Sequence, residues 1–180
     1  PDLVVLHYTG MRDGASALAR LCDPQSKVSA HYVIEEDGTV YSLVEENLRA
    51  WHAGKSYWRG LVDINSHSIG IEIVNPGHEF GYRAFPDTQM RAVLTLCEEI
   101  KKRYKLPATA FLGHSDIAPM RKEDPGELFN WKMLSLYGIG VWPEFLEQDN
   151  YPLTLMDAEK LLAKIGYETG VDEQGLRAAI

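Results

Sequence analysis

Apolar residues in the first half of the chain gather in short runs that end at turn residues. Residues 3–6 are apolar throughout, and residues 68–75 are mostly apolar with a single charge, Glu72, before a Pro-Gly pair. Short runs of this kind, rich in Val and Ile, are typical of buried strands. In residues 31–44, β-branched and aromatic residues flank Asp37-Gly38, a dipeptide that strongly predicts a β-hairpin.

The spacing becomes helical in residues 87–104. Apolar residues recur there every three to four positions and form one stripe: Met90, Val93, Leu94, Cys97 and Ile100. Charged residues lie off the stripe, so an amphipathic helix is predicted, ended by Leu106-Pro107. Residues 13–22 and 130–137 are predicted to form further helices, and residues 109–113 a short strand.

Strands and helices therefore mix along the chain, which predicts an α/β fold with a central mixed β-sheet flanked by helices. The character changes after Pro143-Glu144, where an amphipathic helix over residues 153–165 and the start of another over residues 172–180 are predicted. We expect a domain over residues 1–147 and, over residues 148–180, a linker with a partial helical module. The module alone has too few apolar positions for a core.

Size and charge exclude some classes of protein. The chain has 180 residues, a formal net charge of −8 and an isoelectric point of about 5.2. The excess of acids argues against a nucleic-acid partner, which would need a basic face, and no apolar run approaches the roughly 20 residues that span a bilayer. Because an apolar strand follows Pro1 almost at once, we expect that a leader or upstream segment has been left out. Cys22 and Cys97 are expected to be ordinary core thiols.

Two predicted strands end in histidine. His7 closes the first apolar run, and His114 follows the predicted strand of residues 109–113. His114 also opens a Pro-bounded loop, residues 114–126, that holds several carboxylates. Zinc prefers imidazole nitrogen and carboxylate oxygen, and a set of two His and one carboxylate leaves a fourth position open, as in catalytic sites. The sequence therefore predicts one Zn²⁺ ion on both histidines and a carboxylate of this loop.

The carboxylate ligand is Asp124 or Asp116, and spacing alone does not separate them. Each histidine taken singly is more often an ordinary polar residue at a strand end. Their joint placement favours the metal site. Zinc there would lower the pKa of a bound water toward about 7 and produce hydroxide near neutral pH.

Glu72 and Lys122 are the candidates for catalytic groups. Desolvation raises the pKa of a carboxylate in an apolar strand, which suits a base that takes a proton from a metal-bound water. A buried ion pair of Glu72 with Arg or Lys is the alternative. Lys122 lies two residues before Asp124 and would stabilise an oxyanion; otherwise it is a solvated loop lysine.

Trp51 and His52, followed by Ala-Gly, are candidate substrate-binding residues. A flat aromatic face and an imidazole beside a small-residue turn suit a sugar or a peptide, although Trp is more often found in a core. His31, at the start of the hairpin, is expected to be structural. His67 and His78 lie in loop-like segments and are assigned no role.

Five ordered motifs make the chain resemble a known family. They are Val-Val-Leu-His-Tyr-Thr (4–9), Ser-Ala-His-Tyr-Val-Ile (29–34) with Asp-Gly-Thr-Val-Tyr (37–41), Ala-Trp-His-Ala-Gly (50–54), Asn-Ser-His-Ser-Ile-Gly-Ile-Glu-Ile (65–73) and the loop from 114 to 126. Over residues 3 to about 145 the chain resembles the zinc-dependent N-acetylmuramoyl-L-alanine amidases of the type 2 amidase and peptidoglycan-recognition-protein fold.

The resemblance implies a complete site: zinc on His7, His114 and Asp124, with Glu72 as general base and Lys122 as the oxyanion stabiliser. It thereby decides for Asp124 as the carboxylate ligand. One branch of the family has a Tyr before the hairpin His and a Cys as third ligand. Ala30 and Asp124 stand at those positions here, so the chain resembles the bacterial branch with a catalytic Glu.

The activity implied is hydrolysis of the amide between N-acetylmuramic acid and L-alanine in peptidoglycan or muropeptides. A non-catalytic peptidoglycan-recognition module is the alternative, and a zinc peptidase acting on the stem peptide would use the same chemistry. Residues from about 153 to 180 are similar to the first part of a bacterial peptidoglycan-binding helical module. This similarity favours the bacterial envelope, in the periplasm or at the outer membrane, over the cytoplasm.

Overall fold

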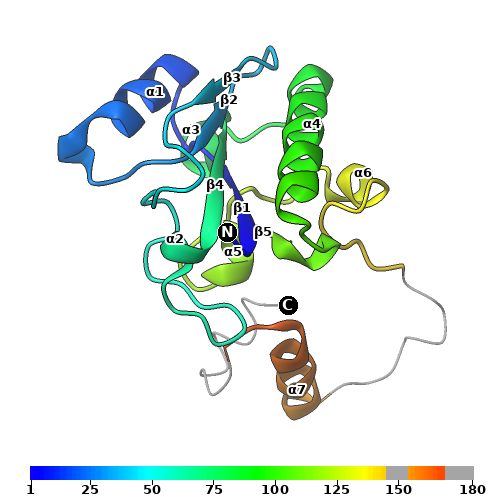
Figure 1. Ribbon diagram of the computed structural model, residues 1–180. Coiled ribbons are helices and arrows are strands. Elements are labelled where there is room, and N and C mark those ends of the chain that lie inside the picture. The colour runs from blue at the N-terminus through cyan, green and yellow to red at the C-terminus, as the bar shows by residue number, and fades with distance from the viewer. Residues whose placement is uncertain (145–153, 169–180) are drawn as a thin grey trace.

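A five-stranded sheet forms the centre of the molecule, and its strands lie in the order β3-β2-β4-β1-β5 (Figure 1). The computed structural model describes residues 1–144 and 154–168. The strands are β1 (Leu3–Tyr8), β2 (Tyr32–Ile34), β3 (Val40–Ser42), β4 (Ser68–Ile73) and β5 (Phe111–Gly113). All neighbours pair in parallel except β2 and β3, which form the antiparallel hairpin. The predicted α/β fold with a central mixed sheet is confirmed.

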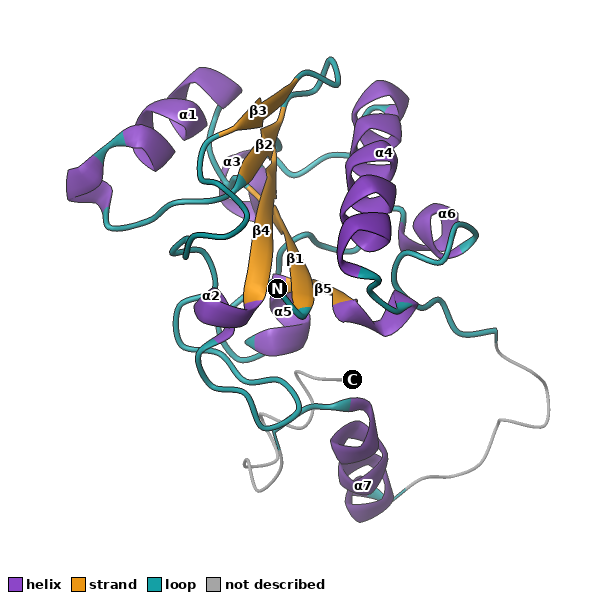
Figure 2. Ribbon diagram, viewed as in Figure 1, coloured by secondary structure: helices purple, strands orange, loops and turns teal. Residues whose placement is uncertain are grey.

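Helices lie on both sides of this sheet, with α1 and α4 on opposite sides (Figure 2). They are α1 (Gly14–Cys22), α2 (Ile64–His67), α3 (Gly77–Phe80), α4 (Asp87–Tyr104), α5 (His114–Ile117), α6 (Trp131–Ser135) and α7 (Leu155–Ile165). The carboxylate of Asp13 accepts the N–H of Ser16 and caps α1. The predicted strand at 109–113 is shortened to β5 because Ala108–Ala110 forms a 3₁₀ turn after Pro107.

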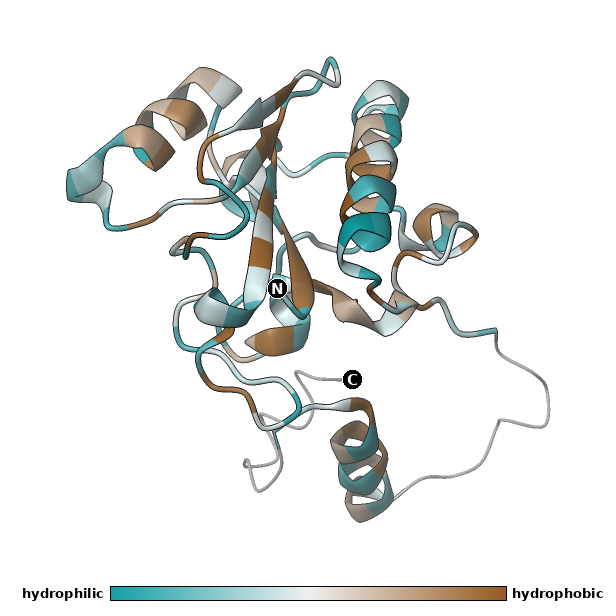
Figure 3. Cartoon of the chain, in the orientation of Figure 1, coloured by the Kyte–Doolittle hydropathy of each residue, from teal (hydrophilic) through white to brown (hydrophobic). Residues whose placement is uncertain are grey.

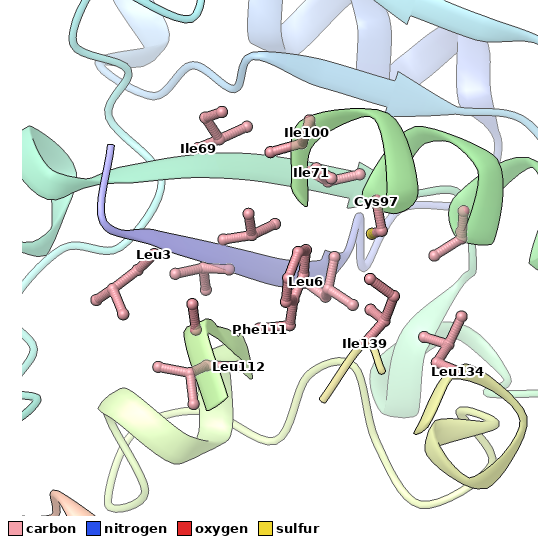
Figure 4. Packing of buried hydrophobic residues seen from close by; sticks show 14 of the residues in the cluster. Leu3, Leu6, Ile69, Ile71, Cys97, Ile100, Phe111, Leu112, Leu134 and Ile139 are labelled. Carbon is pink, nitrogen blue, oxygen red and sulfur yellow. The ribbon is translucent and has the colours of Figure 1, made fainter. Parts of the chain in front are cut away.

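The core lies between β1, β4, β5 and α4. Figure 3 shows β1 as largely hydrophobic, whereas α4 carries both hydrophilic and hydrophobic residues. Figure 4 shows the side chains that meet there, among them Leu6, Ile71, Cys97 and Ile100, all buried. Cys97 is therefore a core thiol as expected, but Cys22 is exposed. The expectation was wrong for Cys22 because that residue ends α1 beyond the part of the helix that packs inward.

The C-terminal end of α7 contacts the rest of the described chain. The carbonyl of Gly166 accepts the N–H of Arg59 at 2.8 Å, and the rings of Tyr167 and Trp58 meet edge to face with centroids 5.0 Å apart. Residues 172–180, predicted to start another helix, lie outside the described residues. The division into a domain over 1–147 and a module over 148–180 stays a prediction. Among the described residues, no helix has the length and apolar character needed to cross a bilayer.

Candidate active site at the carboxyl ends of the strands

The carboxyl ends of three parallel strands bring the candidate residues together. In the pairing of β1 with β4, His7 stands opposite Glu72; in the pairing of β1 with β5, Leu6 stands opposite Gly113. His114 follows Gly113 directly, so the register places it beside His7. Open α/β sheets commonly bind their ligands at this edge.

Two imidazoles and one carboxylate converge there. Nδ1 of His7 lies 2.9 Å from Nδ1 of His114, and Oδ2 of Asp124 lies 2.9 Å from the first nitrogen and 3.0 Å from the second. All three side chains are buried. Within residues 1–144 and 154–168, they form the one group of three such side chains close enough to hold a metal ion.

The protonation of these groups suits a cation. Burial, followed by the charge of His114, lowers the pKa of His7 to about 4, so this imidazole is neutral near pH 7. Burial opposes the ionisation of Asp124, but its contacts with the imidazoles of His114 and His7 outweigh burial and hold the pKa of Asp124 well below its usual range. Neutral imidazole and ionised carboxylate are the forms that bind metal ions.

A hydrogen bond from Nε2 of His114 to the backbone fixes the tautomer of this imidazole. Nε2–H of His114 donates to the carbonyl oxygen of Ala53 at 3.0 Å, which leaves Nδ1 with its lone pair toward the cluster. Arg121 donates to the same carbonyl at 2.7 Å and to that of Lys55 at 2.8 Å. Sequence reasoning missed this role of Arg121 because its partners are carbonyl groups of a turn far away in the chain.

Glu72 lies beside this group without a partner of its own. Its Oε2 atom is buried and has no hydrogen bond, and no ion pair of Glu72 is present among the described residues. Burial, followed by the negative charge of Asp124, raises the pKa of Glu72 to about 8, and Lys122 opposes this rise. Leaving a buried carboxylate oxygen unsatisfied is costly, so such a group calls for a functional explanation.

A cavity of about 510 Å³ opens over the cluster, and His7, His114, Asp124, Glu72 and Lys122 all line it. Trp51 and His52 line it as well. Trp51 is 56% exposed, and the guanidinium of Arg49 lies over its ring at 4.3 Å. His52 is half-buried, with Nδ1 only 3.0 Å from Nε2 of His7.

Two other sequence candidates lie outside the cluster. Asp116, the second candidate ligand, accepts the N–H of Gly113 at 2.7 Å and the hydroxyl of Tyr167 at 2.8 Å, so its carboxylate is used in local structure. His31 is fully buried; its Nδ1 accepts the N–H of Gly70 at 2.9 Å and its Nε2–H donates to Leu48 at 3.0 Å. This is the structural role expected of His31.

Buried His and Asp side chains that are close enough to hold a metal ion, beside an unpaired carboxylate at the open edge of an α/β sheet, are typical of hydrolases that use a metal-bound water. The chain belongs to the N-acetylmuramoyl-L-alanine amidase family, whose sequence profile matches residues 1–127.

Curated relatives agree with this assignment. N-acetylmuramoyl-L-alanine amidase AmiD of Escherichia coli (strain K12) is 37% identical over an alignment of 190 positions, which covers 94% of this chain and 68% of AmiD. The 1,6-anhydro-N-acetylmuramyl-L-alanine amidase AmpD of Haemophilus influenzae is 39% identical over 109 residues, which cover 60% of this chain and 57% of AmpD. The match to AmiD thus extends beyond the part shared with AmpD.

Solved structures agree as well. E. coli AmiD in complex with the substrate anhydro-N-acetylmuramic acid-L-Ala-D-γ-Glu-L-Lys superposes with a TM-score of 0.88 at 34% identity, over 99% of this chain and 77% of AmiD. Pseudomonas aeruginosa AmpDh3 in complex with anhydromuramic pentapeptide gives a TM-score of 0.88 at 32% identity, over 99% of this chain and 79% of AmpDh3. The predicted family, fold and class of enzyme are confirmed, whereas the roles of single residues stay predictions.

Proposed function

We propose that this chain hydrolyses the amide bond between the lactyl group of N-acetylmuramic acid and L-alanine, in peptidoglycan or muropeptides, with one zinc ion. Membership of the amidase family and the muropeptide ligands of AmiD and AmpDh3 support the substrate class. One observation carries the proposal for this chain's own site. His7, His114 and Asp124 place three ligand atoms within 3.0 Å of one another, beside the unpaired Glu72.

The ligand set fits zinc. Zinc binds imidazole nitrogen and carboxylate oxygen at about 2.0 to 2.2 Å, so two ligand atoms of a tetrahedral site stand about 3.3 Å apart. The observed separations of 2.9 to 3.0 Å differ from this by a few tenths of an ångström. Two nitrogens and one oxygen also leave one position for water or substrate, which is the arrangement of catalytic rather than structural zinc.

The chain's own residues supply the proton transfers and part of the charge stabilisation. Zinc, when bound, supplies a Lewis acid and a water activated near neutral pH. Glu72, whose ionised form a neighbouring cation would favour, accepts the proton that the attacking water loses and delivers it to the nitrogen of the departing L-alanine, as the C–O bond forms and the C–N bond breaks. Lys122 places its ammonium near the carbonyl oxygen as negative charge develops there.

Arg20 and Trp51 supply binding groups on the wall of the same cavity. The aromatic face of Trp51 suits the sugar or the peptide backbone. Arg20 is exposed and has no ion pair among the described residues. A stem peptide with a D-γ-Glu residue carries a free α-carboxylate, and a guanidinium binds a carboxylate through two parallel hydrogen bonds. We assign Arg20 to this carboxylate.

We place the enzyme in the bacterial envelope. The support is the resemblance of the chain's C-terminal part to a peptidoglycan-binding module. An enzyme with such a module would act on polymeric wall or large muropeptides. Release of peptide from purified sacculi tests this, and activity on soluble fragments alone would contradict it.

Mass spectrometry of the products from a defined muropeptide tests the reaction. Cleavage at the lactyl amide should yield the free sugar and the intact stem peptide, and a chelator should stop it. A peptidase would instead release shortened stem peptides. A non-catalytic recognition module would bind the muropeptide and release nothing, with or without chelator.

A further inference from the structure

We propose that His52 is a positioning residue for the metal ligand His7. In this role, Nδ1 of His52 accepts the Nε2–H of His7 and thereby fixes the tautomer of His7 whose Nδ1 is free for the metal ion. The proposal rests on the metal site of the proposed function. It replaces the direct substrate contact that sequence reasoning assigned to His52.

A chain of three hydrogen bonds determines where the protons lie. The hydroxyl of Ser68 donates to the carbonyl oxygen of Ile64 at 2.7 Å, because a carbonyl can only accept. Oγ of Ser68 therefore accepts the contact at 3.2 Å from Nε2 of His52, which must carry the proton.

The remaining nitrogen of His52 then has to be an acceptor, since a neutral imidazole has one N–H. It faces Nε2 of His7 at 3.0 Å, so that nitrogen of His7 carries the proton. Nδ1 of His7, 2.9 Å from both His114 Nδ1 and Asp124 Oδ2, keeps its lone pair. The carbonyl acceptor of Ile64 thus determines the tautomer of His7, three hydrogen bonds away.

Packing keeps the His52 ring in this orientation. The ring lies directly over Gly70, where a Cβ atom would come within 2.3 Å of it. The rings of His52 and His7 meet edge to face, with centroids 5.1 Å apart and an interplanar angle of 78°. The backbone N–H of His52 donates to Oδ1 of Asn65 at 2.9 Å. These contacts hold the ring against Gly70 of β4, beside His7 of β1.

The effect of His52 on His7 differs from that of a carboxylate acceptor in the same place. Metal-binding histidines usually donate their second N–H to a carboxylate, a carbonyl or water. Here the partner is a second imidazole, and the chain ends on the neutral carbonyl of Ile64. The orientation of His7 is therefore fixed without adding negative charge near the ion, so that a bound cation would keep more of its power to polarise the amide.

Zinc affinity of the metal-stripped protein, measured by competition with a chelator, tests the proposal without relying on activity. His52→Leu keeps a similar volume but has no acceptor, and we expect about 10- to 100-fold weaker zinc binding. His52→Asn places an oxygen where Nδ1 was. Its zinc affinity should stay within about threefold of that of the parent, because the hydrogen-bond acceptor for His7 is kept. Ser68→Ala removes the group that fixes the tautomer of His52, so its zinc affinity should fall between those of His52→Leu and His52→Asn.

The visible absorption of the Co²⁺-substituted protein supplies a second readout, because its bands depend on ligand geometry. The positions and intensities of these bands should change in His52→Leu and remain those of the parent in His52→Asn. Equal zinc affinity in His52→Leu and the parent, or equal losses in the Leu and Asn variants, would overturn the proposal. If His52→Leu fails to fold, as judged by the melting temperature of the metal-free form, an unchanged affinity in Ser68→Ala overturns it instead.

The parent and His7→Ala separate this proposal from the proposed function. A parent that binds no zinc, or that binds it equally well after His7→Ala, contradicts the metal site itself. A parent that binds zinc and cleaves muropeptide, while His52→Leu behaves like the parent, contradicts only the positioning role of His52.

Discussion

Replacing Glu72 by Gln should make the metal-free protein more stable and the enzyme nearly inactive. The side chain keeps its shape, so zinc binding should persist, while loss of the base should lower kcat by about 10²- to 10⁴-fold. The gain in stability should depend on pH. Glutamine has no charge to desolvate, whereas the parent must hold a carboxylate in a site that disfavours its ionised form.

The size and sign follow from the pKa of Glu72, which burial raises from 4.5 to about 8. The folded protein holds this proton more tightly than the unfolded chain does, so the free energy of unfolding falls as pH rises between these two values. The gap corresponds to an upper limit of about 5 kcal/mol. Because Glu72 lines an open cavity and water screens its charge, we expect about 1 to 3 kcal/mol above pH 8.

Thermal melts of both chelator-treated proteins measure this difference. For a chain of this size, about 1 to 3 kcal/mol corresponds to a Tm gain of roughly 2 to 10 °C at about pH 8.5, and little gain is expected at about pH 4.5. Glu99→Gln, on an exposed position of α4, is the matched control and should show neither effect. An equal gain at both pH values, or none at pH 8.5, would refute the assigned cause.

Other substitutions test the remaining parts of the site. Lys122→Ala should lower kcat by about 10²- to 10³-fold, with zinc content unchanged; loss of zinc would point to a structural role. Arg20→Gln should abolish a preference for D-γ-Glu over D-isoglutamine substrates, measured as a ratio of kcat/KM values; an unchanged ratio contradicts the assignment. Gly70→Ala should displace the His52 ring and weaken zinc binding without touching a ligand, as chelator competition would show.

The strands and the long helix could be predicted from the sequence because their signals are local. The periodicity of residues 87–104 gave the bounds of α4, and the Asp-Gly pair gave the hairpin. His7 and His114 could be proposed as neighbours because each follows an apolar run, and parallel strands align their carboxyl ends. These inferences needed no knowledge of distant contacts.

The contacts around the cluster could not be predicted in the same way. The acceptors of Arg121 are backbone carbonyls, which every residue has, so the sequence gives no sign of them. The contact of His52 with His7 depends on the missing side chain of Gly70 in a neighbouring strand. Asp116 looked equivalent to Asp124 because both lie in one loop, and only the turn after β5 shows which one faces the cluster.

The position of β1 in the sheet has a consequence for biosynthesis. This strand emerges from the ribosome before both of its neighbours, β4 and β5, and the partners of His7 lie 107 and 117 residues further along. At about 5 to 20 residues per second, translation alone delays their meeting by roughly 5 to 20 seconds. An apolar strand left waiting that long is a natural substrate for holding chaperones. A cation held by His7, His114 and Asp124 would then be acquired only after the polypeptide completes its folding, because the unfolded chain has no preformed site.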